Sequence, residues 1–279
     1  MIVVTGATGN VGRPLVRMLA EAGEKVTAVA RRAPEALPEG VRAVAGDLTD
    51  AEGFAGVLEG AEKLFLLFAP GSFAADVPGV LAAARAAGVR QVVLLSSQGV
   101  ATRPESASHG QLGAAIEEAV RASGMEWTIL RPSGFQSNVL AWAEQVRGAR
   151  TVSAPFGDVG VPFVDPEDIA AMAAAALRES GHAGRTYVLT GPVAETPRER
   201  TRVLGEILGE SVRFEEVTAE QARAQMLTFM PADAVETTLA ILGAPTEDEL
   251  RISPDIDTVL GRPARPFAAW ARRNIDAFR

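Results

Sequence analysis

Residues 1–16 read MIVVTGATGNVGRPLV, and this stretch decides the fold. An apolar run over residues 2–5 gives way to Gly6, Gly9 and Gly12, after which an amphipathic helical pattern begins. Glycines permit a tight turn and let a ligand approach the backbone, while the first N–H groups of a helix attract an anion. The spacing is therefore typical of a loop that holds a dinucleotide pyrophosphate. The alternative is a tight turn that binds nothing.

Short apolar runs alternate with alanine-rich helical patterns along the first half of the chain. Because these runs are apolar throughout, they are typical of strands that helices cover on both faces of a parallel sheet. The alternation indicates repeated βαβ units, and the expected fold class is α/β, a Rossmann-type doubly wound parallel sheet. We expect its strands at residues 2–5, 25–30, 42–45, 63–68, 91–95 and 127–130.

The regular alternation ends after Pro132. We expect an NAD(P)-binding domain over residues 1–132 and a smaller C-terminal α/β substrate lobe over residues 133–279, interleaved with late strands of the main sheet. In this second part, the pattern predicts strands at 151–154, 161–164, 187–189 and 212–214, and helices that start at Pro166, Pro197, Ala219 and Pro231.

The composition argues against several classes of partner. The 279 residues carry 27 Lys and Arg against 35 Asp and Glu, without a long run of like charge, so we expect no nucleic-acid partner. With no cysteine and two histidines, we expect no metal site. The longest apolar stretches fall short of the roughly 20 residues that cross a bilayer, and the early first strand leaves no room for a secretory leader. We therefore expect a cytoplasmic protein without membrane contact. Its oligomeric state stays open, a homodimer included.

Two arginines end the second predicted strand, where an NAD-selective fold usually places a carboxylate for the ribose. The planar guanidinium of Arg31 can hold a 2′-phosphate through two hydrogen bonds, so the pair Arg31-Arg32 favours NADP(H). Solvated surface arginines are the alternative. After the third strand, Asp47 either accepts a hydrogen bond from the adenine amino group or caps the next helix, a role that Asp50 could also fill.

Several motifs together resemble the NmrA-like atypical short-chain dehydrogenases. They are TGATGNVG, ARR after the second strand, GDL after the third, FAPG after the fourth, LLSSQGV after the fifth and WTILRPSGFQSN after the sixth. The resemblance covers most of the chain. This family includes NADPH-dependent quinone reductases and triphenylmethane-dye reductases, together with NADP(H)-binding redox sensors that regulate a protein partner.

The resemblance implies a set of site residues by position. Those expected to bind the cofactor are Gly6, Thr8, Gly9, Asn10, Val11 and Gly12 at the pyrophosphate, Arg31 at the 2′-phosphate, Asp47 and Leu48 at adenine, and Phe68, Ala69 and Pro70 at the adenosine ribose. Ser96, Ser97 and Gln98 are expected under the nicotinamide, with Pro132, Phe135 and Gln136 closing the pocket from the lobe side. Leu48 and Phe68 could instead be plain core. Trp142, Met226, Phe229 and Met230 either line an apolar acceptor pocket or belong to the core.

The catalytic pair of typical short-chain dehydrogenases, a tyrosine and a lysine four residues later, is missing from its expected helix. The only tyrosine is Tyr187, far downstream, while His109 stands near the tyrosine position and Gly113 at the lysine position. A positioned general acid contributes typically about 10²–10⁴-fold to a rate, so unactivated ketones should be poor substrates. A quinone is an easier acceptor, because hydride addition makes an aromatic hydroquinone anion.

His109 recurs at helical spacing with Leu112, Ile116 and Ala119, which predicts that it lies on a buried stripe. There it either donates to a substrate oxygen or is a structural histidine, with Ser106 or Ser108 as the helix cap. Glu117 and Glu118 are expected to face solvent. Asp165, before Pro166, is expected to cap a helix.

The function expected is NADPH-dependent hydride transfer to a quinone-like or other conjugated small molecule, in a cleft between the two domains. The expected catalytic residues are His109, Ser97 and Gln98, and the expected substrate contacts are Phe135, Gln136 and Trp142. The alternative is a catalytically silent NADP(H) sensor that regulates a protein partner.

Overall fold

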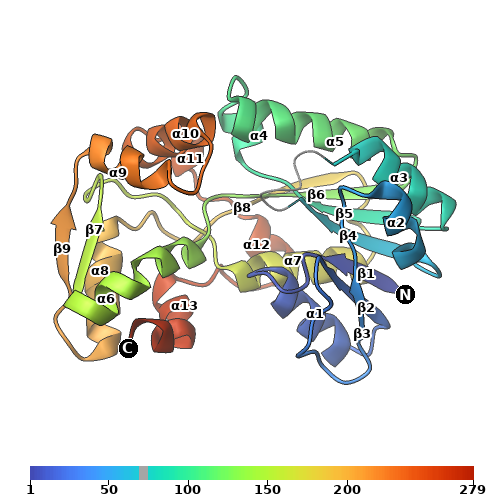
Figure 1. The fold of residues 1–279 in the computed structure, drawn as a ribbon, viewed down its shortest axis with the longest axis horizontal. Helices are drawn as coiled ribbons and strands as arrows, with labels where there is room; N and C mark the ends of the chain where they lie inside the picture. Colours follow the sequence, from blue (N-terminus) through green and yellow to red (C-terminus); the bar gives the residue numbers. More distant parts are fainter. Residues whose placement is uncertain (69–74) are drawn as a thin grey trace. The chain divides into compact units, whose positions relative to one another are not determined.

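The computed structural model describes residues 1–68 and 75–279 (Figure 1). Ala69 and Pro70, two of the expected ribose contacts, lie outside the described residues. One compact unit comprises Met1–Ser97, Gly113–Arg131 and Pro166–Val188, and a second comprises Gln98–Leu112, Pro132–Asp165 and Leu189–Arg279. The division expected at residue 132 is thus simpler than the observed one, because residues 98–112 group with the second unit and residues 166–188 with the first.

The first unit is built on a parallel sheet. Within the described residues its order is β3-β2-β1-β4-β5-β6-β8, and the pairings from β3 to β6 are parallel. The expected α/β doubly wound fold is therefore confirmed. The strands are β1 (Ile2–Thr5), β2 (Val26–Ala30), β3 (Arg42–Ala45), β4 (Lys63–Leu67), β5 (Gln91–Leu95), β6 (Glu126–Pro132) and β8 (Arg185–Leu189).

The strand order reverses at β1, which lies between β2 and β4. Ile2 of β1 is paired with Val26 on one side and with Lys63 on the other. The chain thus runs outward from β1 to β3 and then returns to the centre at β4. Open α/β sheets bind ligands at the carboxyl ends of the strands beside such a reversal. The ends of β1, β2, β4 and β5 are therefore where a nucleotide site is expected.

Helices cover both faces of this sheet (Figure 1). On one face, α1 packs against α7 and against β1 and β2. On the other, α2, α3 and α5 contribute Phe54, Leu81 and Val120 to an apolar cluster that includes Leu64 and Leu94 of the sheet. The helices are α1 (Gly12–Glu21), α2 (Ala51–Ala55) with the short turn η1 (Gly56–Leu58), α3 (Val77–Ala86), α5 (Leu112–Ala122) and α7 (Pro166–Arg178).

One strand differs from the expectation of two covered faces. Three of the four residues of β3 are exposed. β3 is the edge strand of the sheet, so it has a neighbouring strand on one side only and its side chains receive little cover. The sequence of residues 42–45 therefore predicts the strand correctly, but it predicts more burial than the structure shows.

The second unit contains a two-stranded parallel sheet in which Thr151 of β7 pairs with Arg213 of β9. Its core stacks Phe267 on Trp270, with ring centroids 5.6 Å apart, beside Phe278. The elements are α4 (Gly99–Thr102), η2 (Ala107–Gln111), η3 (Gln136–Trp142), α6 (Ala143–Ala149), β7 (Thr151–Ala154), α8 (Pro197–Leu208), β9 (Arg213–Glu216), α9 (Ala219–Met226), α10 (Ala232–Gly243), α11 (Glu247–Leu250), α12 (Asp255–Leu260), α13 (Phe267–Asn274) and η4 (Ile275–Phe278).

The strand expected at 161–164 is wrong. This segment makes two isolated bridges, from Val161 to Glu195 and from Val164 to Phe135. Pro162 supplies no N–H for a ladder, and its carbonyl instead accepts the Gly191 N–H at 2.9 Å. An apolar run thus produced a buried loop.

The expected helix starts are confirmed. α7, α8 and α9 begin at Pro166, Pro197 and Ala219, and α10 begins at Ala232 with Pro231 as its N-cap. Among the described residues, no helix combines the length and the apolar character that spanning a bilayer requires.

Candidate nucleotide and catalytic site

The glycine loop joins β1 to α1 at the reversal of strand order. Gly6 has a φ of +63°, a conformation that residues with a side chain rarely adopt. The Gly9 N–H donates to the Gly6 carbonyl oxygen at 3.0 Å and closes the turn. A Cβ atom on Gly12 would lie 2.1 Å from that same oxygen, so glycine is required where the helix starts. The loop therefore has the tight geometry that the sequence predicts.

The tip of the loop is open to a ligand. Thr8, Gly9 and Asn10 are exposed. The N-cap of α1 is Val11, whose side chain is buried and cannot cap the helix. The side chain of Val11 therefore does not cap the first N–H groups of α1. A helix start of this kind is suited to binding a phosphate. Any contact of Val11 with a nucleotide would come from its backbone.

Arg31 and Arg32 are both exposed at the carboxyl end of β2. Asp47, after β3, accepts hydrogen bonds from the backbone N–H and hydroxyl of Thr49, both at 2.9 Å. These bonds lower the pKa of Asp47, and the nearby charge of Arg31 acts in the same direction. The structure thus brings together the residues expected at the 2′-phosphate and at adenine. The helix cap is Asp50, which accepts the Gly53 N–H at 2.9 Å.

Leu48 and Phe68 belong to the apolar core. Leu48 is buried, and Phe68 is half-buried against the same cluster. Each has a structural role that explains its apolar side chain, and their contacts with adenosine stay a prediction.

The expectation that Glu117 faces solvent is wrong. Its side chain is 0% exposed. The Ser96 hydroxyl donates to its Oε1 at 2.6 Å, Arg131 donates to both oxygens at 2.8 and 2.6 Å, and Arg121 donates at 2.8 Å. Burial raises the pKa of Glu117, but the hydrogen bonds from Arg131 and Ser96 and the charge of Arg131 outweigh it, so the pKa lies below its usual value. Glu118 is exposed, as expected.

The sequence contained a signal for this buried carboxylate. Arg121 follows Glu117 by one helical turn, and Arg131 stands at the end of the sixth strand in the LRP motif. Buried carboxylates need such partners. Helical periodicity did not predict the burial of Glu117, because it placed the buried stripe at Ile116 and Ala119, one residue before the fully buried Glu117 and Val120.

His109 lies in the second unit, in the π-helical turn η2, and is half-buried. A π turn contains an extra residue, so a stripe extrapolated from His109 at ordinary helical spacing misses the buried face. Within α5 the fully buried residues are Glu117 and Val120, whereas Leu112 and Ile116 are half-buried. The stripe expected through His109 is half-buried, and its members Ile116 and Ala119 pack against the apolar cluster of the first unit.

Hydroxyl groups surround the His109 turn. Ser106 caps it by accepting the His109 N–H at 3.2 Å, which resolves the two capping candidates in favour of Ser106. The Ser108 hydroxyl lies 2.9 Å from Nδ1 of His109. Burial lowers the pKa of His109, against the opposing charges of Asp233 and Glu249. The imidazole is thus neutral at neutral pH, and donation from Ser108 to Nδ1 would leave the proton on Nε2.

Gln98 is buried, and its side-chain amide has the hydrogen-bond partner that a buried polar group needs. Its Nε2 donates to the Asp248 carbonyl oxygen at 3.0 Å, and its backbone N–H donates to the Pro132 carbonyl oxygen at 2.9 Å. These bonds anchor the start of α4. Ser97 is half-buried, and the catalytic roles expected for both residues stay predictions.

The three expected substrate contacts differ in exposure. Gln136 is fully buried, and its Nε2 donates to the carbonyl oxygens of Phe163 and Arg265 at 3.1 and 3.2 Å. Its Oε1 has no hydrogen-bond partner among the described residues. Phe135 is half-buried, and Trp142 packs against the core of the second unit. These positions favour a structural role for Trp142.

The other candidates of the second unit have structural surroundings. Asp165 is fully buried and pairs with Arg273. Met226 and Met230 pack against the small cluster of α9 and α10, whereas Phe229 is 69% exposed. Phe229 is therefore not a core residue.

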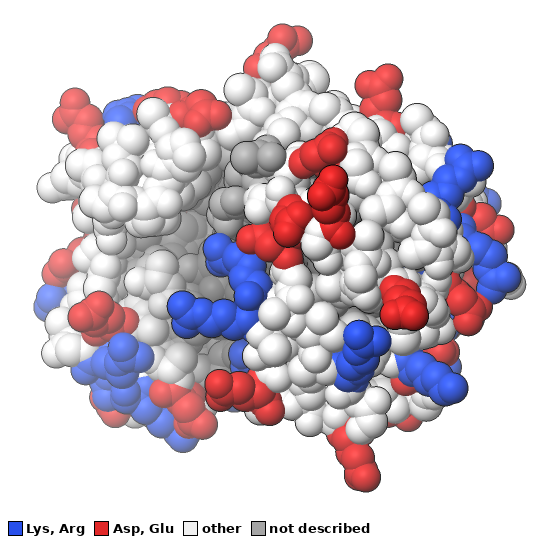
Figure 2. All heavy atoms as spheres, turned by 45° about the vertical axis from the view of Figure 1, so that its right-hand side comes forward, with Lys and Arg blue, Asp and Glu red and all other residues white. Residues whose placement is uncertain are grey.

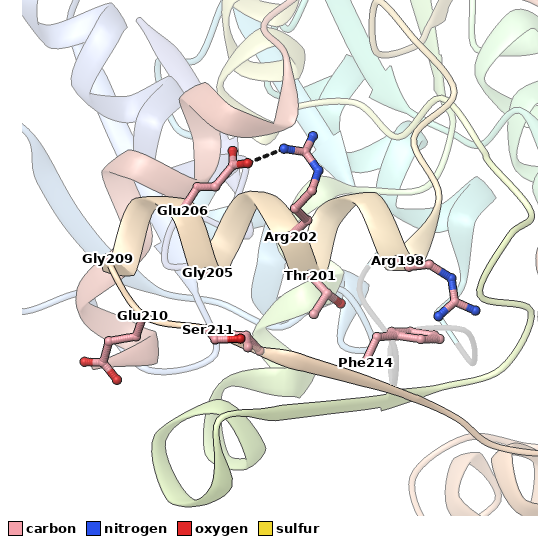
Figure 3. A pocket seen from close by; sticks show the side chains of 10 residues that line it. Arg198, Thr201, Arg202, Gly205, Glu206, Gly209, Glu210, Ser211 and Phe214 are labelled. Atoms are coloured by element: carbon pink, nitrogen blue, oxygen red, sulfur yellow. Dashed lines mark hydrogen bonds and ion pairs between the residues drawn. The ribbon is translucent and has the colours of Figure 1, made fainter.

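A groove of about 520 Å³ lies along α8 and β9 (Figure 3). The guanidinium of Arg198 stacks over the ring of Phe214 at 4.7 Å, and Arg202 pairs with Glu206. None of the residues expected to bind nucleotide or acceptor lines this groove.

Charged groups give no sign of a metal centre in the part of the chain that the structure describes, where no cluster of three or more His, Asp or Glu could hold an ion. Acidic and basic side chains are interspersed on the face shown in Figure 2.

Comparisons with known proteins place these features in a family. The family model described as NAD(P)H-binding matches residues 6–180. The chain is 40% identical to (4-alkanoyl-5-oxo-2,5-dihydrofuran-3-yl)methyl phosphate reductase of Streptomyces griseus, over 100% of this chain and 99% of the relative. It is 34% identical to the NAD(P)H azoreductase of Xenophilus azovorans, again over 100% and 99%. The NADPH-dependent quinone oxidoreductase of Escherichia coli has a similar structure, with a TM-score of 0.77 and 25% identity over 98% of this chain and 99% of that one. The chain therefore belongs to the NAD(P)H-binding family.

Proposed function

We propose that this protein transfers hydride from NADPH to a conjugated, electron-poor small molecule such as a quinone. The observation that carries the proposal is that a half-buried, neutral histidine, His109, stands near the position where typical short-chain dehydrogenases have the tyrosine acid. The chain's one tyrosine, Tyr187, has its hydroxyl 2.9 Å from Nδ1 of His182, within the first unit. A weak or absent general acid selects for acceptors that stabilise their own negative charge.

The relatives' names describe acceptors of this kind. They are a dihydrofuran that carries oxo and alkanoyl groups, an azo compound and a quinone. In an oxo-alkanoyl dihydrofuran or a quinone, the charge that follows hydride addition is delocalised onto carbonyl oxygens. Because such an acceptor needs little proton donation in the transition state, losing the tyrosine costs less than the usual factor for a general acid.

The residues of the first unit fit a dinucleotide. The Gly6–Gly12 turn and the start of α1 would hold the pyrophosphate, Arg31 the 2′-phosphate and Asp47 the adenine. When bound, NADPH supplies a hydride that adds to an electron-poor carbon and moves a π electron pair onto oxygen. His109 would donate a hydrogen bond from its Nε2–H to that oxygen, and Ser108 would hold the tautomer.

The preference for NADP(H) over NAD(H) rests on Arg31. Its exposed guanidinium stands at the end of β2, close enough to Asp47 to affect its pKa. A charge-assisted hydrogen bond contributes about 1.5–3 kcal/mol, enough to discriminate between the two nucleotides.

The test is a direct assay of NADPH oxidation with a panel of acceptors, in protein shown by calorimetry to bind NADPH. The panel pairs quinones with aliphatic ketones of similar size. Oxidation with quinones and little with ketones would support the proposal. Equal rates with both would contradict it, because a strong general acid would then have to be present.

A further inference from the structure

Three hydroxyl groups connect His109 to helix α10 within the second unit. Oγ of Ser108 lies 2.9 Å from Nδ1 of His109, and Oγ of Ser106 lies 3.3 Å from Oγ of Ser108. Oγ1 of Thr237, in α10, lies 2.8 Å from Oγ of Ser106, although the two residues are 131 positions apart in the sequence. All four residues are half-buried. Each polar atom is therefore within hydrogen-bond distance of the next, in an unbroken row.

The outer end of this hydroxyl row lies at the exposed start of α10. The Thr237 hydroxyl donates to the Asp233 carbonyl oxygen at 3.1 Å, and Asp233 is exposed. Burial lowers the pKa of His109, and the charge of Asp233 acts against it, so the two residues are close enough to interact. The row thus leads from a half-buried imidazole to a residue in contact with solvent.

The hydroxyl row can be polarised in two directions, because each hydroxyl has one proton and two lone pairs. In the inward direction each hydroxyl donates toward His109, Ser108 donates to Nδ1, and the imidazole proton is on Nε2. In the outward direction Nδ1 carries the proton and donates to Ser108, and Thr237 donates to the Asp233 carbonyl oxygen. The His109 N–H donates to Ser106 at 3.2 Å, and Ser106 has a lone pair for it in either direction. Both directions therefore satisfy the three hydroxyl groups.

A change of direction meets a chemical need of His109. A neutral imidazole has one N–H donor and one acceptor nitrogen. If it lost the Nε2 proton alone, it would become an imidazolate anion, whereas a proton that reaches Nδ1 at the same time keeps the ring neutral. Reversal of the hydroxyl row from inward to outward delivers that proton.

We propose that Thr237, Ser106 and Ser108 form a proton relay to Nδ1 of His109, and that His109 passes its Nε2 proton to the acceptor oxygen as the relay reverses. The relay deepens the proposed function and rests on it, because it requires the hydrogen bond from the Nε2–H to the acceptor oxygen. His109 is the residue that contacts the substrate, and Thr237 is a positioning residue that acts through the two serines.

The atoms and electrons of the step balance. NADPH gives a hydride to an electron-poor carbon, a π electron pair moves onto oxygen, and that oxygen takes the Nε2 proton. Ser108 gives its proton to Nδ1, Ser106 gives its proton to Ser108, and Thr237 gives its proton to Ser106. Hydronium or a buffer acid in the solvent reprotonates Thr237 at the exposed end. Proton exchange with solvent then returns the imidazole proton to Nε2 before the next turnover.

Two acceptors separate proton transfer from hydride transfer. A quinone forms an oxygen anion that takes a proton, whereas a cationic triphenylmethane dye becomes neutral by accepting hydride alone. Thr237→Val replaces the hydroxyl by a methyl group of similar size and interrupts the relay. It should lower quinone turnover about 3- to 10-fold, the value of one neutral hydrogen bond, and leave dye turnover and NADPH affinity unchanged. NADPH absorbance and calorimetry measure these effects.

Matched variants separate the relay from a structural contact. Thr237→Ser retains the hydroxyl and should restore quinone turnover. Thr238→Val makes the same exchange at the next residue of α10, which is also half-buried, and should change nothing. Ser108→Ala interrupts the relay at its other end, so adding Thr237→Val to it should cause no further loss, because residues that act in one chain are coupled.

The number of protons that move is a second readout. Quinone turnover of the wild type is measured in mixtures of ordinary and heavy water. Because the relay moves several protons together, the rate should fall along a curve as the deuterium fraction rises. A straight line, the sign of a single moving proton, or no change in rate would contradict the relay.

The outcomes distinguish the relay from the proposed function. If the wild type binds NADPH but reduces neither acceptor, the proposed function fails and the relay fails with it. If the wild type reduces both, and Thr237→Val changes neither rate or lowers both equally, only the relay is overturned. The heavy-water measurement uses the wild type and a quinone alone, so it tests the relay even if Thr237→Val does not fold or the dye is not an acceptor.

Discussion

Gly6 and Gly12 approach so closely that a Cβ atom on Gly12 would lie 2.1 Å from the Gly6 carbonyl oxygen. Gly9, in the same loop, is exposed, and a Cβ there would meet only that oxygen, at 3.3 Å. The three glycines therefore serve two purposes. Gly12 is required by the packing of the loop on its own helix, and Gly9 leaves room for a ligand.

This difference predicts opposite effects for two valine substitutions. Gly9→Val should leave the protein folded but abolish dinucleotide binding, because a branched side chain would fill the pyrophosphate space. Gly12→Val should lower the free energy of unfolding by about 1–3 kcal/mol or more, as overpacking does. Urea denaturation and NADPH calorimetry measure the two effects. Full NADPH affinity in folded Gly9→Val would mean that the loop is only a turn.

Arg31→Ala tests the choice of nucleotide. Losing a charge-assisted hydrogen bond should weaken NADPH binding about 10- to 100-fold and leave NADH binding nearly unchanged. Arg32→Ala, at the neighbouring exposed arginine, is the matched comparison. An equal loss for NADPH and NADH in Arg31→Ala would reject the 2′-phosphate contact.

His109→Ala tests the proposed hydrogen-bond donor to the acceptor oxygen. Turnover with quinones should fall by something like 10²-fold, at the lower end for a general acid, while NADPH affinity stays the same. His109→Gln retains an N–H donor and should lose less. Normal turnover in His109→Ala would leave His109 with the structural role that its bonds to Ser106 and Ser108 already give it.

The ionised carboxylate of Glu249 should make the stability of the second unit depend on pH in the acidic range. It is buried and accepts hydrogen bonds from Arg103 at 2.8 and 2.7 Å. Burial raises the pKa of Glu249, but Arg103 and the Thr246 N–H outweigh it and lower the pKa below the usual value of a glutamic acid. A carboxyl with a depressed folded-state pKa stabilises the fold above about pH 4.5, and this contribution disappears as the pH falls through the folded-state pKa.

The corresponding measurement is urea denaturation at pH 7 and pH 3. Glu249→Gln should destabilise the protein by about 3 kcal/mol at pH 7, as loss of a buried ion-pair partner does, and by less at pH 3. Glu247→Gln, on the exposed side of the same helix, should have little effect at either pH. A loss for Glu249→Gln that is equal at both pH values would contradict the assignment.

The strands and the glycine loop could be predicted because their signals are local. Residues 2–5, 42–45, 91–95 and 151–154 are apolar runs bounded by turn residues, and each is a strand with those bounds. Segment 161–164 looks the same in sequence, but Pro162 and its hydrogen bond to Gly191 make it a loop. Tertiary partners that are distant in the sequence decide such cases.

The site was predicted less completely for the same reason. Glu117 is buried because Ser96 and Arg131, 21 and 14 residues away, supply its hydrogen bonds. The periodicity of one helix cannot reveal a partner that lies on a strand of the sheet. The π turn at His109 shifted the helical pattern further. The residues expected to bind the nucleotide, in contrast, stand directly after strands, where the carboxyl edge of a parallel sheet brings them together.

The central claim is that this chain transfers hydride from NADPH to conjugated acceptors without a tyrosine acid. The most direct measurement follows NADPH absorbance after mixing the protein with a quinone, an acyl dihydrofuranone, an azo dye and an aliphatic ketone. We predict oxidation with at least one conjugated acceptor, on the order of 10²-fold faster than with the ketone, since a ketone depends on general-acid catalysis. Tight NADPH binding without oxidation above background for any acceptor would contradict the claim.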